Sequence, residues 1–332
     1  MSGASLPKDL LARILESYGI PSFQLRSVRG GYRNISHHVS SRVGEVNVML
    51  LKHEPCIVER IDHVDALAEH VWRAGVPVRT RYDKRIMRLH GRSDRYIVLY
   101  HYLSGETIPW EAYTMKHIKL LGWALAEFHH AAQSYTGELP SVIKEYRTLA
   151  TRMMGYFVRD DVRTAVADKC HLMIDTAVVD SFLKLVDACT DLPDQQALHM
   201  DFVRGNILFG DGSDSRFRIG DIALTGIIDL EKAAHGPLIF DIARTLAFLY
   251  VDTIKSADKV YKYFMHSGYI KRGKGRSDDV SLSLLDDLVT LMLSYDLYKF
   301  MRDNPYESLV HNHHFRRTRD ILIERKVLYY TH

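Results

Sequence analysis

The chain begins with a helical pattern and then changes to a pattern typical of strands. Over the first 20 residues, apolar side chains recur every three or four positions and predict an amphipathic helix, with Ser5 as N-cap and Gly19 at its end. From Phe23 to Lys52, short runs of strand-forming residues alternate with turn residues and predict a small antiparallel sheet. Helical spacing returns over residues 57 to 74, and an apolar run at 95 to 103 predicts a further strand.

Beyond Gly105 the pattern is mostly helical. A wide apolar stripe predicts a helix over residues 114 to 131, and a strand-rich stretch at 197 to 230 precedes further helices at 239 to 267 and 280 to 302. This order predicts an α+β fold with two lobes: a small antiparallel sheet with one helix, and a larger, mainly helical lobe. We place the lobes at residues 1–103 and 104–332, with their boundary near 103 to 107.

Composition and charge narrow the class of protein. The 332 residues are long enough for two domains, and 46% hydrophobic with 26% charged residues is typical of a folded globular chain. Forty-four Lys and Arg against 41 Asp and Glu give a charge of only +3, so we expect no nucleic-acid partner. Three cysteines without CxxC spacing argue against a disulfide framework. No uncharged run reaches about 18 residues, so we expect no membrane partner and a cytoplasmic location.

The residues from 198 to 243 carry the chemistry. His199, Asp201 and Asn206 follow one apolar run, and a second apolar run ends at Asp229. Phosphoryl transfer needs one carboxylate at the acceptor hydroxyl and separate oxygen ligands for magnesium. The spacing allows a single loop to direct Asp201 and Asn206 into one cleft, while a strand delivers Asp229. We therefore assign Asp201 to the acceptor, and Asn206 and Asp229 to the metal.

This segment resembles the aminoglycoside phosphotransferase and choline kinase group, which has a protein-kinase-like fold. The resemblance covers roughly residues 25 to 300 and includes His199, Asp201, Asn206, Asp229 and Asp241 in the family order. It implies that Asp201 is the catalytic aspartate, that Asn206 and Asp229 are magnesium ligands, and that Asp241 braces the catalytic loop. For His199 we favour a structural role that orders the loop. Met200 replaces the usual glycine of this pattern.

The first lobe resembles the nucleotide-binding part of the same family. Residues at a two-glycine turn, at the end of the third strand, on the next helix and in the linker are implied to bind ATP: Gly30, Gly31, Asn34, Lys52, Asp65, Glu69, His101 and Leu103. Lys52 is expected to contact the phosphates and to pair with Asp65 or Glu69, between which the sequence does not decide. His101 and Leu103 are expected to read the base through their backbone.

We conclude that the sequence predicts an ATP- and magnesium-dependent kinase that transfers the γ-phosphate to a hydroxyl of a small acceptor. The acceptor classes left open are amino sugars, amino alcohols, sugars and hydroxy amino acids. Asp286, Asp287 and Asp296 slightly favour a cationic acceptor over an anionic one bound near the basic residues 271 to 276. The alternative is a catalytically silent nucleotide-binding pseudokinase that serves as an interaction platform; a metal-dependent hydrolase ranks below both.

Overall fold

The computed structural model describes residues 5–30, 34–91, 94–212, 215–271 and 281–331. Its first part is a five-stranded antiparallel sheet in the order β1-β2-β3-β5-β4. The strands are β1 (Phe23–Gly30), β2 (Ile35–Ser41), β3 (Gly44–Lys52), β4 (Met87–Leu89) and β5 (Arg95–His101). We call this part, with its two helices α1 (Lys8–Ser17) and α2 (Ile57–Arg73), the sheet region.

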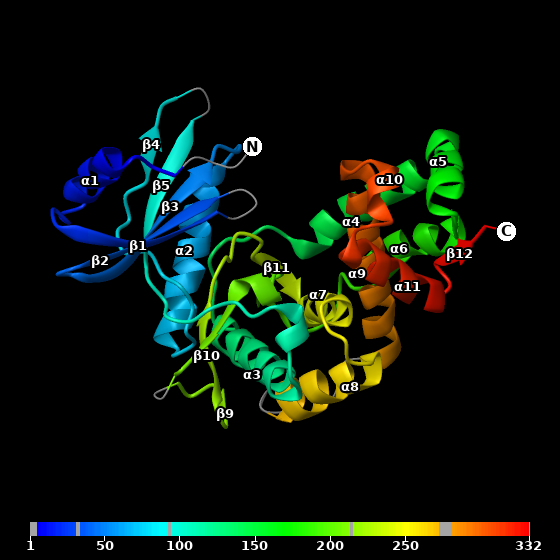
Figure 1. Cartoon of the computed structure of the whole chain (residues 1–332). Helices are drawn as coiled ribbons and strands as arrows, with labels where there is room; N and C mark the ends of the chain where they lie inside the picture. The colour runs from blue at the N-terminus through cyan, green and yellow to red at the C-terminus, as the bar shows by residue number, and fades with distance from the viewer. Residues whose placement is uncertain (1–4, 31–33, 92–93, 213–214, 272–280, 332) are drawn as a thin grey trace.

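Side-chain alternation along the strands explains how the two helices cover the sheet. On β3, Val46, Val48 and Leu50 pack with α1 in one apolar cluster, whereas Leu51 packs with the start of α2 in another. Successive side chains of a strand point to opposite faces, so each helix covers one face. Figure 1 shows α1 and α2 separated by the strands.

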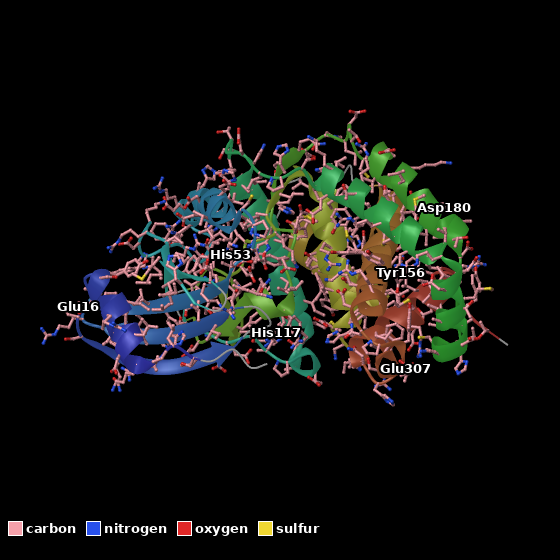
Figure 2. All side chains as sticks on the ribbon, turned by 90° about the horizontal axis from the view of Figure 1, so that it is seen from above. Glu16, His53, His117, Tyr156, Asp180 and Glu307 are labelled. Atoms are coloured by element: carbon pink, nitrogen blue, oxygen red, sulfur yellow. The ribbon has the colours of Figure 1, made fainter. Side chains whose placement is uncertain are left out.

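The rest of the chain is mainly helical, and we call it the helical region. Its helices are α3 (Met115–Ala132), α4 (Val142–Phe157), α5 (Asp160–Cys170), α6 (Thr176–Ala188), α7 (Leu238–Val251), α8 (Ala257–Tyr261), α9 (Leu282–Asp303), α10 (Tyr306–Leu309) and α11 (His313–Glu324). Its strands are β6 (Leu172–Ile174), β7 (Gln195–Leu198), β8 (Ile207–Gly210), β9 (Arg218–Ile219), β10 (Ile222–Ile227), β11 (Ala234–Pro237) and β12 (Leu328–Tyr330). Figure 2 shows Glu16 of α1 and Asp180 of α6 toward opposite ends of the molecule.

Helix α2 joins the two regions. Ile57 and Ile61 near its start pack under the sheet, whereas Leu67 and Val71 belong to the large core of the helical region. The buried face of this one helix therefore fixes the position of the sheet relative to the helical region.

Close packing also fixes α3, the central helix of the helical region. The segment Lys262–Ile270 continues α8 as a π-helix and lies against α3. A Cβ atom at Gly122 would lie 2.2 Å from the carbonyl oxygen of Phe264, so only glycine permits this approach. The contact brings Tyr269 to His129 of α3, where its hydroxyl lies 2.8 Å from Nδ1.

The predicted mixed α+β architecture is confirmed, with one local correction. Helix α1 begins after Pro7 and has no side-chain cap, so the Ser5 N-cap is wrong; Ser5 Oγ instead lies 3.2 Å from His37 Nε2. The division into lobes at residue 103 stays a prediction. Within the described residues, no helix combines the length and the apolar character needed to cross a bilayer.

Candidate active site

A cavity of about 1060 Å³ lies between the sheet region and the helical region. One wall comes from β1 to β3 and the segment after β5, including Gly30, Asn34, Asn47, Met49 and Leu103. The opposite wall comes from the loop after β7, the segment after β10 and the end of α9, including Asp201, Asn206, Asp229, Asp296 and Lys299. This cavity therefore collects residues that are far apart in the sequence.

The loop from His199 to Asn206 is held by Asp241 in the first turn of α7. The backbone N–H groups of His199 and Met200 donate to the two carboxylate oxygens at 2.7 and 3.0 Å, and His129 Nε2 lies 3.0 Å from Oδ2. Asp241 is completely buried. Burial is the largest single influence and opposes its charge, but the hydrogen bond and charge of His129 and the interactions with His199 together outweigh burial and hold the pKa of Asp241 below its usual value. The loop thus rests on a buried, ionised carboxylate.

Met200 stands where the family pattern has glycine, and the structure shows how the loop accommodates it. Its φ is +60°, in the left-handed region where glycine is favoured, yet its side chain is only 5% exposed and belongs to the core. For a residue other than glycine, this backbone conformation is less favourable by about 1–2 kcal/mol of conformational free energy. The bond from Met200 N–H to Asp241 and the packing of the side chain offset that cost. The loop therefore keeps the backbone shape that a glycine would take.

The contacts of His199 indicate a structural role. Its Nδ1 accepts a hydrogen bond from the backbone N–H of Asp201 at 3.2 Å, and its ring meets Phe128 and Phe202 edge-on. Burial lowers the pKa of His199, so the ring is neutral at pH 7. A neutral ring that accepts from the Asp201 N–H positions the start of the loop from His199 to Asn206.

Three oxygen-bearing side chains meet at the helical wall. Asn206 Nδ2 donates to the carbonyl oxygen and to Oδ2 of Asp201, both at 3.0 Å. The N–H of Ile228 donates to the Asn206 carbonyl at 2.9 Å, which places Asp229 beside the loop. Lys232 Nζ lies 2.7 Å from Asp201 Oδ1. The structure thus brings Asp201, Asn206 and Asp229 together in the cavity wall, as the spacing predicted.

The donor set fits magnesium. Among the described residues, no group of three or more His, Cys, Asp and Glu side chains gathers to hold a metal. Asn206 donates through its nitrogen, so its Oδ1 is free to act as a ligand beside the carboxylate of Asp229. Magnesium commonly takes only one or two protein carboxylates and completes its shell with water and phosphate oxygens. A small oxygen set of this kind is what such a site needs.

The sheet wall agrees less well with the predicted nucleotide residues. Gly30, Asn34 and Leu103 line the cavity, whereas Gly31 lies outside the described residues. His101 is not among the residues that line the cavity, and its backbone N–H donates to the Thr80 carbonyl at 2.9 Å. That N–H is therefore not available to a base.

The expected pairing of Lys52 is wrong. Asp65 and Glu69 instead contact Lys84, whose Nζ lies 2.9 and 2.5 Å from their carboxylates. Lys52 is exposed and is not among the cavity-lining residues. The reason is strand parity: Asn47 and Met49 of β3 face the cavity, whereas Lys52 falls in the series of residues that face α1.

The sequence also missed several charged residues at the cavity. Arg79, Lys232 and Lys299 line it, and no motif or spacing distinguishes them from surface charges. Asp296 also lines it, but its carboxylate receives Arg244 Nη1 and Nη2 at 2.8 and 3.0 Å. Asp286 pairs with Arg325 at 2.7 Å and is not a lining residue. Asp287 does not line the cavity either, so α9 presents little unpaired negative charge to it.

The comparisons with known proteins agree with this arrangement. The model of the phosphotransferase enzyme family matches residues 25–264. A microcompartment-associated aminopropanol kinase has 16% identity and a TM-score of 0.66, with 94% of each chain covered. An amicoumacin kinase, solved with AMP-PNP, Ca²⁺ and Ami, has 13% identity and a TM-score of 0.63, covering 94% of this chain and 96% of that one. An ethanolamine kinase from Plasmodium vivax has 16% identity and a TM-score of 0.51, covering 96% and 89%.

No curated protein matches the sequence. At these low identities the solved structures establish the fold, and the expected protein-kinase-like fold is confirmed. The family model covers most of the chain and includes Asp201, Asn206, Asp229 and Asp241. The chain therefore belongs to the phosphotransferase enzyme family and is a phosphotransferase that acts on a hydroxyl group of a small molecule.

Proposed function

We propose that this protein is an ATP- and magnesium-dependent kinase that transfers the γ-phosphate to a hydroxyl of a small acceptor. The observation that carries the proposal is the joint placement of Asp201, Asn206 and Asp229 in one cavity wall. A carboxylate, an amide oxygen and a second carboxylate are the groups that phosphoryl transfer requires of a protein.

Asp201 is the residue that acts on the acceptor. Its Oδ2 accepts from Asn206 and its Oδ1 contacts Lys232, so both carboxylate oxygens are held in position. Asp201 orients the acceptor hydroxyl and takes its proton as the new bond to phosphorus forms and the bond to the leaving oxygen breaks. Lys232 then balances the negative charge that remains at the reacting groups.

Magnesium would be held by Asn206 Oδ1 and Asp229, and when bound it neutralises the charge of the phosphates. The hydrogen bond from Ile228 N–H to the Asn206 carbonyl keeps these two ligands at a fixed separation. Glu231 is close enough to Asp229 for their charges to interact; burial and then that charge raise the pKa of Glu231. The raised pKa makes Glu231 a weaker candidate for a magnesium ligand.

For the acceptor we propose a hydroxy amino acid, in preference to the cationic acceptor that the sequence slightly favoured. Lys299 on α9 is half-buried, lines the cavity and forms no ion pair with any described residue, whereas Asp296 is neutralised by Arg244. An unpaired ammonium group in a partly desolvated wall favours an anionic ligand such as a carboxylate.

Direct measurement of phosphate transfer tests the proposal. We expect magnesium-dependent turnover of ATP with a panel of hydroxylated compounds, and a loss of at least about a thousandfold in kcat for Asp201→Asn. Nucleotide binding by that variant should stay close to wild type. Binding of ATP without transfer to any acceptor, in wild type and variant alike, would favour the pseudokinase alternative.

Matched acceptors test the finer proposal. Serine and ethanolamine differ by one carboxylate, as do homoserine and 3-aminopropanol. We expect the member with the carboxylate to have the higher kcat/KM, and Lys299→Met to remove that preference. A higher kcat/KM for the simple amines would contradict the acceptor class and leave the kinase activity standing. The cytoplasmic location stays a prediction.

A further inference from the structure

A nucleotide polyphosphate brings several negative charges into the cavity, so the cations of its walls decide where the phosphates lie. The described lining residues include six cations: Arg29, Arg60, Arg79, Lys232, Lys299 and Arg302. Four of them already have a carboxylate partner: Arg29 with Glu106, Arg60 with Glu54, Lys232 with Asp201, and Arg302 with Asp303. Within the described residues, Arg79 and Lys299 have none.

Arg79 lies on the sheet side of the cavity and Lys299 on the acceptor side. Lys299 comes from α9 and has its Nζ 5.2 Å from the ring of Tyr295. Arg79 lies in the segment after α2, and its guanidinium carbon stands 4.5 Å from the ring centre of Tyr100 on β5. On the nucleotide side, Arg79 is thus the described cation that is not already neutralised.

The backbone places Arg79 next to the strand that delivers Asp229. The Arg79 N–H donates to the carbonyl of Ile227 at 2.9 Å, and Val78 forms a parallel bridge with the same residue. Ile227 precedes Asp229 by two residues, so the backbone of Arg79 is hydrogen-bonded close in the chain to the proposed metal ligand. This contact keeps the cation in a fixed relation to Asp229.

The side chain of Arg79 also faces a small adjoining cavity. That cavity of about 30 Å³ is lined by Met49, Asp65, Tyr100, Asp229 and Glu231 among others. Three carboxylates share this cavity with Arg79, namely Asp65, Asp229 and Glu231, and none of them forms an ion pair with Arg79 among the described residues. The five N–H donors of the guanidinium therefore stay available to a ligand that enters beside Asp229.

We propose that Arg79, and not Lys52, is the cation that binds the phosphate groups of the nucleotide. This inference rests on the proposed function, because it assumes a nucleoside triphosphate in the cavity. A guanidinium matches phosphate with two parallel hydrogen bonds, and stacking on Tyr100 orders it before the ligand arrives. Met49 occupies the cavity-facing position of β3 that a lysine of the right parity would need.

Nucleotide binding measured by titration calorimetry tests the assignment without any acceptor. Adenosine, ADP and ATP, the last two with magnesium, are titrated into the wild type, Arg79→Met, Arg79→Lys and Lys52→Met. Arg79→Met should weaken ADP and ATP about 10- to 100-fold and leave adenosine unchanged. Arg79→Lys should recover part of the loss. Lys52→Met, the matched control, should change each affinity by less than about threefold.

The outcomes separate this inference from the proposed function. A loss for Lys52→Met with none for Arg79→Met would overturn the assignment while the kinase proposal stands. Equal weakening of adenosine and ATP by Arg79→Met would overturn it as well, because the residue would then act through Tyr100 and the base. Failure of the wild type to bind ATP would overturn both. Thermal unfolding of each variant identifies a change that comes only from loss of the fold.

Discussion

The two walls of the cavity are built from different kinds of polar interaction. In the helical wall, Asp241 is completely buried and receives the backbone N–H groups of His199 and Met200. Behind the sheet wall, Asp65 and Glu69 of α2 meet Lys84, whose side chain is 69% exposed. The helical wall depends on fully buried hydrogen bonds, whereas the carboxylates of α2 depend on ion pairs with a lysine that is largely exposed.

This difference determines how firmly each wall is specified. A buried donor or acceptor without a partner costs about 1–3 kcal/mol, so the residues around Asp241 have few alternatives. An exposed ion pair contributes about 0–1 kcal/mol, so one lysine replaces another at little cost. The contacts of the helical wall can therefore be predicted from its residue types. The contacts of the sheet wall depend on which of several similar ion pairs forms.

The largest effect should come from the helical wall. We expect Asp241→Asn to lower the free energy of unfolding by about 2–4 kcal/mol, because the amide group presents a donor where a carboxylate accepted from two backbone N–H groups. Urea unfolding measures the loss. Asp168→Asn on the exposed face of α5 is the matched control and should stay within about 0.5 kcal/mol of wild type. Similar losses of unfolding free energy in both variants would show that the buried hydrogen bonds of Asp241 do not stabilise the protein more than an exposed carboxylate does.

The sequence was sufficient for the helical wall because its residues are close in the chain or lie on one strand. His199 to Asn206 form a single loop, and β10 runs directly from the core to Asp229. Such local constraints fix which side chains meet. The proximity of Asp201, Asn206 and Asp229 could accordingly be predicted, and so could the order of most helices and strands.

The sheet wall could not be predicted because two facts are invisible in the sequence. The face on which Lys52 lies depends on the parity of β3, which only the packing of Val46, Val48 and Leu50 under α1 reveals. The contact of Arg79 with Ile227 joins segments about 150 residues apart along the chain. The pairing of β6 with β12 is equally remote and was not foreseen.

A second prediction concerns the backbone of the helical wall. Met200→Gly and Met200→Ala remove the same buried side chain, but only glycine relieves the positive φ. We expect the glycine variant to be more stable than the alanine variant by about 1 kcal/mol. At Met153, buried within α4, the order should be reversed because glycine weakens a helix. The same order at both sites would mean that position 200 is not strained.

A third prediction concerns pH and the sheet region. His37 is buried and its Nε2 accepts from the Leu6 N–H at 3.2 Å; burial lowers the pKa of His37. The unfolded chain therefore binds more protons near pH 6 than the folded chain, and this residue's contribution to stability falls as pH drops below about 6.5.

The readout is the slope of unfolding free energy against pH between 7.5 and 5.5. His37→Gln can keep an acceptor for Leu6 N–H but does not titrate, so its slope should be smaller than that of wild type. His314 changes in the opposite direction, because its hydrogen bond to Asp252 raises its pKa, and it is present in both proteins. An unchanged slope would show that protonation of His37 does not affect the sheet region.

The smallest effect should come from the ion pairs of the sheet wall. A double-mutant cycle between Lys84 and Glu69, with alanine at each position, should give a coupling of about 0.2–1 kcal/mol. The matched cycle between Lys52 and Glu69 should give a coupling near zero, since no ion pair joins them among the described residues. Salt should reduce the first coupling and leave the second unchanged, because exposed charges are screened. A larger coupling for Lys52 would show that the two lysines exchange places in solution, and the sheet wall would then have the pairing that its sequence predicted.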